Sequence, residues 1–135
     1  MLLKTTPPDI FNPKPNGSFR VLATGDAVGK PGRQLLRDSI PAIRAALDVD
    51  FVVANVENCS GGQGPNIKNA RELLACSYLD VLTTGDHIRD RGEIAEVLAD
   101  SPRLLRPINY RDLAGSGAII VDVKGIKVGV ANMMG

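Results

Sequence analysis

The chain has 135 residues, which is enough for one domain, and 44% of them are hydrophobic, so a buried core is expected and disorder throughout is excluded. With 16 Lys and Arg against 15 Asp and Glu, the net charge is +1, and there are only three Phe, two Tyr and no Trp. This balance argues against stable nucleic-acid binding, and no apolar run approaches the roughly 20 residues of a membrane span. Two cysteines are too few for a disulfide framework, which favours a reduced cytoplasm.

Residues 1–19 are predicted to form a proline-rich N-terminal tail, and residues 20–135 the folded domain. Four of the nine prolines lie in the first 19 residues, and Asn16-Gly17-Ser18 closes this stretch with a sequence typical of turns. Because proline has no backbone N–H to donate, the tail is not expected to belong to the core.

After the tail, short apolar runs alternate with amphipathic stretches. Apolar runs at residues 20–24, 51–55 and 80–84 are typical of buried parallel strands. Each is followed by apolar residues at helical spacing, which predicts three helices. These helices lie at about residues 31–47, around Ala70 to Leu74, and at residues 93–98.

The last two apolar runs, residues 118–123 and 126–131, flank Lys124-Gly125. A two-residue connection of this kind predicts an antiparallel hairpin. The order is therefore βαβαβα followed by a hairpin, and the fold class is α/β, a layered sheet with helices packed on it.

Polar side chains follow each of the first three predicted strands. Asp26 follows the first strand, Glu57 and Asn58 the second, and Asp86 and His87, the only histidine, the third. In open α/β sheets, ligands bind beyond the carboxyl ends of the strands, at a switch in strand order. The sequence therefore predicts that these five side chains meet at one rim of the sheet.

Several carboxylates brought together repel one another unless a cation neutralises them. Oxygen ligands with a little nitrogen suit Mn²⁺, Fe or Mg²⁺, and such a rim suits metal-assisted hydrolysis at phosphorus. Glu57 has two oxygens with which to bridge two metals, and His87 can donate a proton to a leaving alkoxide.

Each of these residues also has a purely structural interpretation. Asp26 is suited to capping a helix or forming an Asx turn, Glu57 and Asn58 to a solvated loop, and His87 to a structural hydrogen bond. Their occurrence after three consecutive strands, rather than any one of them, favours the functional interpretation.

Two further patterns concern phosphate. The segment from Gly25 to Pro31 has one residue too few between its glycines for a phosphate-binding loop, and proline replaces the Ser or Thr that would hold Mg²⁺. Lys30, Arg33 and Arg106 are candidates for attracting a phosphate, although basic residues that flank helices are usually solvated.

From about Arg20 to Gly135, the chain resembles the YmdB-like branch of the calcineurin-like metallophosphoesterases, in the N-terminal half of that family's sandwich. Four blocks carry the resemblance, in the family's order: Val21 to Arg33 (VLATGDAVGKPGR), Asn55 to Asn58 (NVEN), Thr84 to His87 (TGDH) and Arg103 to Tyr110 (RLLRPINY).

The resemblance implies a phosphodiesterase with two divalent metals, Mn or Fe, that hydrolyses 2′,3′-cyclic nucleotides or related phosphodiesters with a metal-activated water. It implies that Asp26 and Asn58 bind the first metal, that Glu57 bridges the metals, that position 86 supplies a ligand to the second and that His87 acts on the leaving group.

The chain departs from the family pattern in two ways. Asp86 stands where the family has Asn, and Arg89 where an aromatic residue is usual. Family members are also longer and carry further metal-binding histidines, whereas no histidine follows His87 here. The missing ligands and an exposed apolar face lead us to expect a homo-oligomer or a complementing protein chain. An inactive binding or assembly module (a pseudoenzyme) and a fragment of a longer reading frame are the alternatives.

Overall fold

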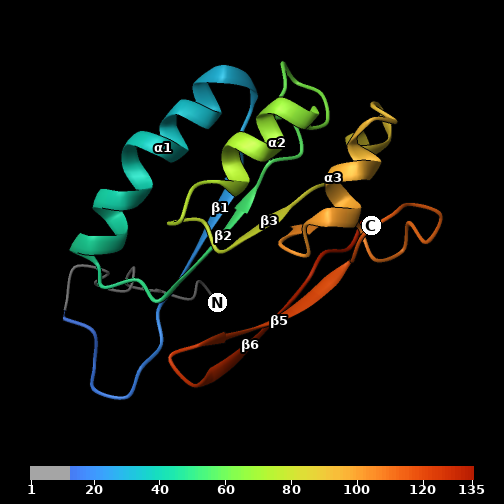
Figure 1. Ribbon diagram of the computed structural model, residues 1–135. Coiled ribbons are helices and arrows are strands. Elements are labelled where there is room, and N and C mark those ends of the chain that lie inside the picture. Colours follow the sequence, from blue (N-terminus) through green and yellow to red (C-terminus); the bar gives the residue numbers. More distant parts are fainter. Residues whose placement is uncertain (1–12) are drawn as a thin grey trace, which may run out of the picture.

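The computed structural model describes residues 13–135, so most of the predicted tail, residues 1–12, lies outside the described residues. A parallel sheet forms the middle of the molecule. Three helices cover one face of this sheet, and a two-stranded hairpin lies against the other (Figure 1). The α/β prediction, with its layered sheet and C-terminal hairpin, is confirmed.

The central sheet has four parallel strands in the order β1-β2-β3-β4. These strands are β1 (Val21–Asp26), β2 (Phe51–Asn55), β3 (Val81–Thr83) and β4 (Leu104–Leu105). The sequence did not predict β4. This strand has only two residues, and a strand pattern needs a longer run of residues to be recognised. Among the described strands, the order follows the sequence, so the expected switch in strand order is not found within this sheet.

The helices agree with the prediction to within a few residues at their ends. They are α1 (Gly29–Ala46), α2 (Ile67–Leu74) and α3 (Ile94–Asp100), with a short 3-10 helix, η1 (Asp86–Arg89), directly after β3. Asn66 caps α2, because its side chain accepts a hydrogen bond from the backbone N–H of Asn69 at 2.8 Å.

The alternation of side chains along β2 divides the core in two. Val52 and Ala54 belong to the larger cluster, which is formed with the three helices and includes Leu36 and Leu73. Phe51, on the opposite face, is fully buried in a second cluster. That cluster joins the sheet to the hairpin through Val81, Leu105, Ile119, Val121, Val123, Val128 and Val130. Because successive strand residues point to opposite faces, one strand serves both cores.

The hairpin consists of β5 (Ala118–Val123) and β6 (Ile126–Ala131), as predicted. Lys124 and Gly125 at its turn both have positive φ, 54° and 83°. Two consecutive residues of this kind match the right-handed twist of a two-residue hairpin, and glycine adopts the conformation without strain.

The buried carboxylate of Asp50 joins three parts of the chain. It accepts hydrogen bonds from the backbone N–H of Arg20 at 2.8 Å, from Lys14 Nζ at 2.7 Å and from Lys124 Nζ in the hairpin turn at 2.9 Å. Phe19 packs against the second core cluster. Residues 14 and 19 of the predicted tail therefore contact the domain, and the boundary between residues 19 and 20 stays a prediction.

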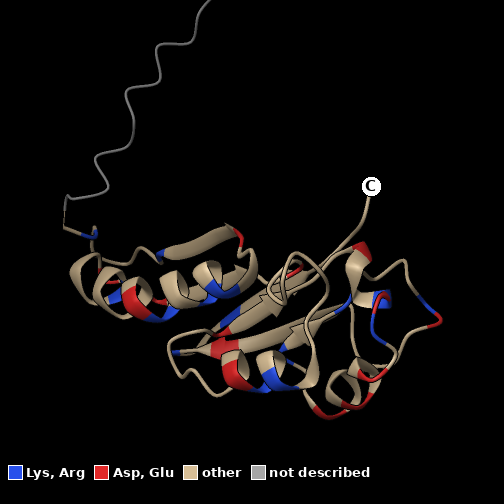
Figure 2. Cartoon of the chain, turned by 90° about the horizontal axis from the view of Figure 1, so that it is seen from above, with Lys and Arg blue, Asp and Glu red and all other residues tan. Residues whose placement is uncertain are grey.

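Positive and negative residues are interspersed along the helices and loops, in keeping with the net charge of +1 (Figure 2). In the part of the chain that the structure describes, no helix has the length and apolar character needed to cross a membrane.

Candidate metal centre

The end of β1 presents Asp26 at the carboxyl edge of the sheet. The pairing of β1 with β2 shifts between Thr24 and Asp26, so Gly25 is an extra residue in the ladder. Such a bulge changes the direction of the strand and of the side chain that follows it. The Asp26 carboxylate accepts hydrogen bonds from Asn58, from its side-chain Nδ2 at 2.6 Å and its backbone N–H at 3.2 Å.

The loop after β2 presents Glu57 and Asn58. The Asn55 side chain accepts a hydrogen bond from the backbone N–H of Glu57 at 2.9 Å, and the Asn58 carbonyl accepts one from Gly29 at the start of α1, also at 2.9 Å. The Arg33 guanidinium donates to the carbonyl of Cys59 in the same loop. The loop is therefore fixed at several points along its backbone.

The end of β3 brings Asp86 and His87 to Glu57. Ligand atoms of these three residues all lie within 4.8 Å of one another. Gly85 makes room for this approach, because a Cβ atom built there would lie 2.1 Å from the Glu57 carboxyl carbon. A glycine is required at this position by the close approach of the carboxylate.

The charges of the cluster are coupled. Burial, together with the neighbouring Asp86 and Asp26 carboxylates, raises the pKa of Glu57. The hydrogen bond from Glu57 lowers the pKa of Asp86. Of the two carboxyl groups, Glu57 is therefore the one that takes up a proton at the higher pH.

Asp90 orients the His87 ring, a contact that the sequence analysis did not identify. His87 Nδ1 and Asp90 Oδ2 lie 2.7 Å apart, and this hydrogen bond raises the pKa of His87. The only signal in the sequence is the three-residue spacing within one helical turn, which is common by chance.

Arg89, the other departure from the family pattern, lies in a side-chain group just beyond the centre. Its guanidinium stacks over the Tyr110 ring at 4.2 Å from the ring centroid and donates two hydrogen bonds to Asp112, at 2.6 and 2.8 Å. A cation over an aromatic face is a favourable contact.

Two of the basic residues considered for phosphate binding are engaged in backbone contacts. Arg33 donates to the Cys59 carbonyl, and Arg106 donates to the carbonyls of Leu113 and Pro107, each at 3.0 Å. These hydrogen bonds indicate a structural role for both arginines. Lys30 is exposed at the start of α1.

All five site residues that the sequence predicted therefore come from the carboxyl ends of β1, β2 and β3. Asp26 and Asn58 are hydrogen-bonded to each other, and Glu57, Asp86 and His87 form the second group. Asn58 of the first group directly follows Glu57 of the second, so the loop after β2 links the two groups.

A family model described as YmdB-like protein matches residues 22–135. The chain belongs to this family. It is 33% identical over 118 residues to a 2′,3′-cyclic-nucleotide 2′-phosphodiesterase of Bacillus subtilis (strain 168), and the match covers 87% of this chain and 44% of that protein.

Two solved structures are similar to this YmdB-like chain. A hypothetical protein from Thermus thermophilus is 31% identical, with a TM-score of 0.76, over 87% of this chain and 45% of that one. A novel phosphatase from Mycoplasma pneumoniae is 26% identical, with a TM-score of 0.77, over 87% of this chain and 43% of that one. The chain thus spans less than half the length of the relatives it matches.

Proposed function

We propose that this YmdB-like chain supplies one half of a metal-dependent phosphodiesterase centre that acts on 2′,3′-cyclic nucleotides or related phosphodiesters. The single observation that carries the proposal is the meeting of Glu57, Asp86 and His87 within 4.8 Å, next to Asp26 and Asn58. The printed name of the B. subtilis relative supports the class of substrate.

The donor set fits divalent metals. Carboxylate and amide oxygens with one imidazole suit Mn²⁺ or Fe. A cation would offset the burial of Glu57 and the repulsion from its neighbouring carboxylates, which raise the pKa of Glu57. Asp26 and Asn58 would hold one metal, Asp86 a second, and Glu57 both. When bound, the metals would activate water and offset the charge of the phosphoryl group.

His87 would act on the leaving group. Since Nδ1 is hydrogen-bonded to Asp90, Nε2 is the ring nitrogen left to donate a proton to the departing alkoxide. The raised pKa of His87 keeps the ring protonated to a higher pH, as a proton donor requires.

The proposal includes a second chain. A hydrolytic centre needs ligands on every side to fix its ions, and the five residues named here come from one edge of one sheet. A complementing polypeptide or another copy of this chain would supply the rest. The cytoplasm remains the proposed location, in keeping with two free cysteines.

The test is Mn²⁺-stimulated cleavage of bis-p-nitrophenyl phosphate and of 2′,3′-cyclic AMP, by the chain alone and with a complementing polypeptide. We expect Asp26→Ala and Glu57→Ala to abolish activity, and Asp100→Ala, an exposed carboxylate at the end of α3, to leave it unchanged. Absence of activity with every metal and partner would refute the proposal.

The second candidate is an inactive family-derived binding or assembly module. The observation that favours it is the edge of β1 that has no strand neighbour among residues 13–135, with the apolar side chains of Val21 and Leu35 exposed. Elemental analysis combined with native mass separates the two functions. Stoichiometric Mn or Fe supports the enzyme, and a stable metal-free complex supports the module.

A further inference from the structure

The turn after β3 carries Arg89 close to the candidate metal centre. Asp86 and Arg89 are the first and last residues of η1. In a 3-10 helix, side chains three residues apart lie one above the other, about 6 Å apart along the axis. His87 follows Asp86 in the same turn. Arg89 therefore lies one helical turn from Asp86, on the same face of η1.

The Arg89 guanidinium is held as a flat platform. One face lies over the Tyr110 ring, 4.2 Å from the ring centroid, and its two Nη atoms donate to the two carboxylate oxygens of Asp112. The Arg89 side chain is still 43% exposed. Because Tyr110 covers one face and Asp112 occupies the Nη edge, the opposite face of the guanidinium is the part left for a ligand.

A hollow of about 160 Å³ borders this platform. Besides Arg89, its lining includes Arg91 and several apolar residues, among them Ile88, Ile94 and Leu113. An apolar cavity of about 150 Å³ is large enough to accept a benzene ring. The hollow therefore has room for one ring of a planar ligand that lies against Arg89.

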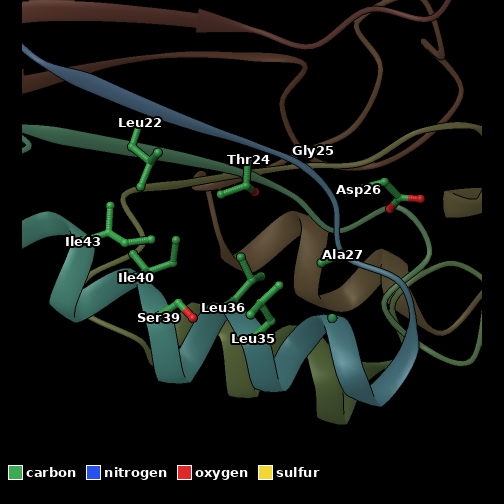
Figure 3. A pocket seen from close by; sticks show the side chains of 11 residues that line it. Leu22, Thr24, Gly25, Asp26, Ala27, Leu35, Leu36, Ser39, Ile40 and Ile43 are labelled. Carbon is green, nitrogen blue, oxygen red and sulfur yellow. The ribbon is translucent and has the colours of Figure 1, made fainter. Parts of the chain in front are cut away.

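A second hollow reaches the candidate centre at the end of β1 but offers no stacking partner. This groove of about 410 Å³ runs between β1 and α1 and extends to Asp26 (Figure 3). Among the described residues that line it, none is aromatic and none carries a guanidinium. A planar aromatic group is therefore better suited to the platform at Arg89.

The proposed substrate class brings such a planar group to this side of the centre. When water adds to the phosphorus of a 2′,3′-cyclic nucleotide and the bond to the 2′ oxygen breaks, that oxygen stays on the ribose and takes up the proton from His87. The nucleobase is attached to the neighbouring carbon of the same ribose. A substrate whose leaving oxygen lies at His87 therefore carries its base within a few bonds, in reach of Arg89 two residues further along η1.

We propose that Arg89, supported by Tyr110 and Asp112, forms a nucleobase-binding subsite in which the base stacks on the guanidinium. Nucleic-acid-binding proteins stack bases on arginine planes and aromatic rings in this way. The pairing with Asp112 favours a stacked base over a second phosphate, because the Nη donors are already engaged by a carboxylate. The inference rests on the proposed function for the position of the ribose at His87, and it narrows the substrate from phosphodiesters in general to nucleotides.

The test uses the metal-free chain and adenosine, which has a base but no phosphate. We expect adenosine to shift the NMR signals of Arg89 and Tyr110. Dimethyl phosphate, which has the charge of a phosphodiester but no base, should leave these signals unchanged.

Variants at Arg89 separate the plane of the guanidinium from its charge. Arg89→Ala and Arg89→Lys should each raise the dissociation constant of adenosine at least fivefold, because both remove the plane. Arg89→Trp, which keeps a plane without the charge, should stay within twofold of the unaltered chain. Arg71→Ala, which removes an exposed arginine of α2, is the matched control and should leave adenosine binding unchanged. Circular dichroism checks that each variant folds.

The inference is overturned if adenosine leaves both signals unchanged, if Arg89→Lys binds adenosine as tightly as the unaltered chain, or if Arg71→Ala weakens binding as much as Arg89→Ala. It is also overturned if dimethyl phosphate shifts the Arg89 signals as adenosine does, because the site would then bind anions. Adenosine binding at Arg89 without cleavage of 2′,3′-cyclic AMP by any combination of metal and partner would refute the proposed function alone. Cleavage of 2′,3′-cyclic AMP with the same KM by Arg89→Ala and the unaltered chain would refute the subsite alone.

Discussion

The side-chain amide of Asn132 donates a hydrogen bond to the carbonyl oxygen of Thr84 at 2.8 Å and a second one to the carbonyl of Leu105 at 3.1 Å. Asn132 follows the hairpin, whereas Thr84 directly precedes Gly85, Asp86 and His87. The contact thus joins the hairpin layer to the turn that carries two of the candidate site residues.

Asn132→Ala should therefore loosen the turn after β3. Removing the donor leaves the carbonyl of the buried Thr84 without this hydrogen bond, which typically costs about 1–3 kcal/mol. We expect a lower free energy of unfolding in urea and weaker Mn²⁺ binding in calorimetry. Asn109→Ala, which removes hydrogen bonds to the exposed segment at Met134, is the control and should leave Mn²⁺ binding unchanged. Equal effects of both variants on Mn²⁺ binding would argue against a role for Asn132 in holding the site.

Gly85→Ala should displace the Glu57 carboxylate from the candidate site. The new methyl group would lie within 2.1–2.3 Å of the Glu57 carboxyl atoms, so the carboxylate must move away. We expect at least a tenfold loss of Mn²⁺ affinity, measured by calorimetry. Gly25→Ala is the matched control, because a Cβ atom there has nothing within 4 Å. If both variants bind Mn²⁺ as the unaltered chain does, the position of Glu57 does not matter for the metal.

Glu57→Gln should stabilise the metal-free protein at pH 8. Burial and the Asp86 carboxylate raise the pKa of Glu57, so the folded state binds the proton more tightly than the unfolded state does. The ionised carboxylate of Glu57 therefore opposes folding above its raised pKa. The difference in free energy of unfolding between the variant and the unaltered chain should vanish as the pH falls below 4.5, the ordinary pKa of a Glu side chain. Urea unfolding from pH 4 to 8 measures this. The exposed Glu93, replaced by Gln, serves as the control, and a destabilised Glu57→Gln at pH 8 would contradict the expected sign.

Asp50→Asn should destabilise the protein at neutral pH. Hydrogen bonds from Arg20, Lys14 and Lys124 hold the pKa of Asp50 well below its usual range, so the ionised carboxylate favours the folded state. This stabilisation is present above the ordinary value of 3.8 and is lost as the pH falls below it. The melting temperature of the variant should thus be lower at pH 7 and approach that of the unaltered chain near pH 2. Asp38→Asn, on the exposed side of α1, should show no such convergence. If the melting temperature of Asp50→Asn is lower than that of the unaltered chain by the same amount at every pH, the charge of Asp50 is not the cause of the lost stability.

The local parts of the fold could be predicted because their signals are local. The apolar run from Phe51 to Asn55 became β2 with the predicted bounds, and Lys124-Gly125 became the hairpin turn, since both depend on side-chain periodicity and turn chemistry within a few residues. The pairing of β3 with β4, which the sequence did not predict, joins Leu82 to Leu104 and Thr83 to Leu105. Two residues carry no periodicity, so only the neighbouring strand shows that they form a strand.

By itself, the sequence determined which residues follow the strands: Asp26, the Glu57-Asn58 pair and the Asp86-His87 pair stand where apolar runs end. The tertiary structure decided how they meet. The extra residue Gly25 in β1 turns Asp26 toward Asn58, and the absence of a side chain at Gly85 lets Glu57 lie against Asp86. These contacts depend on strand register and on free space between segments about 30 residues apart, which no local pattern of residues encodes.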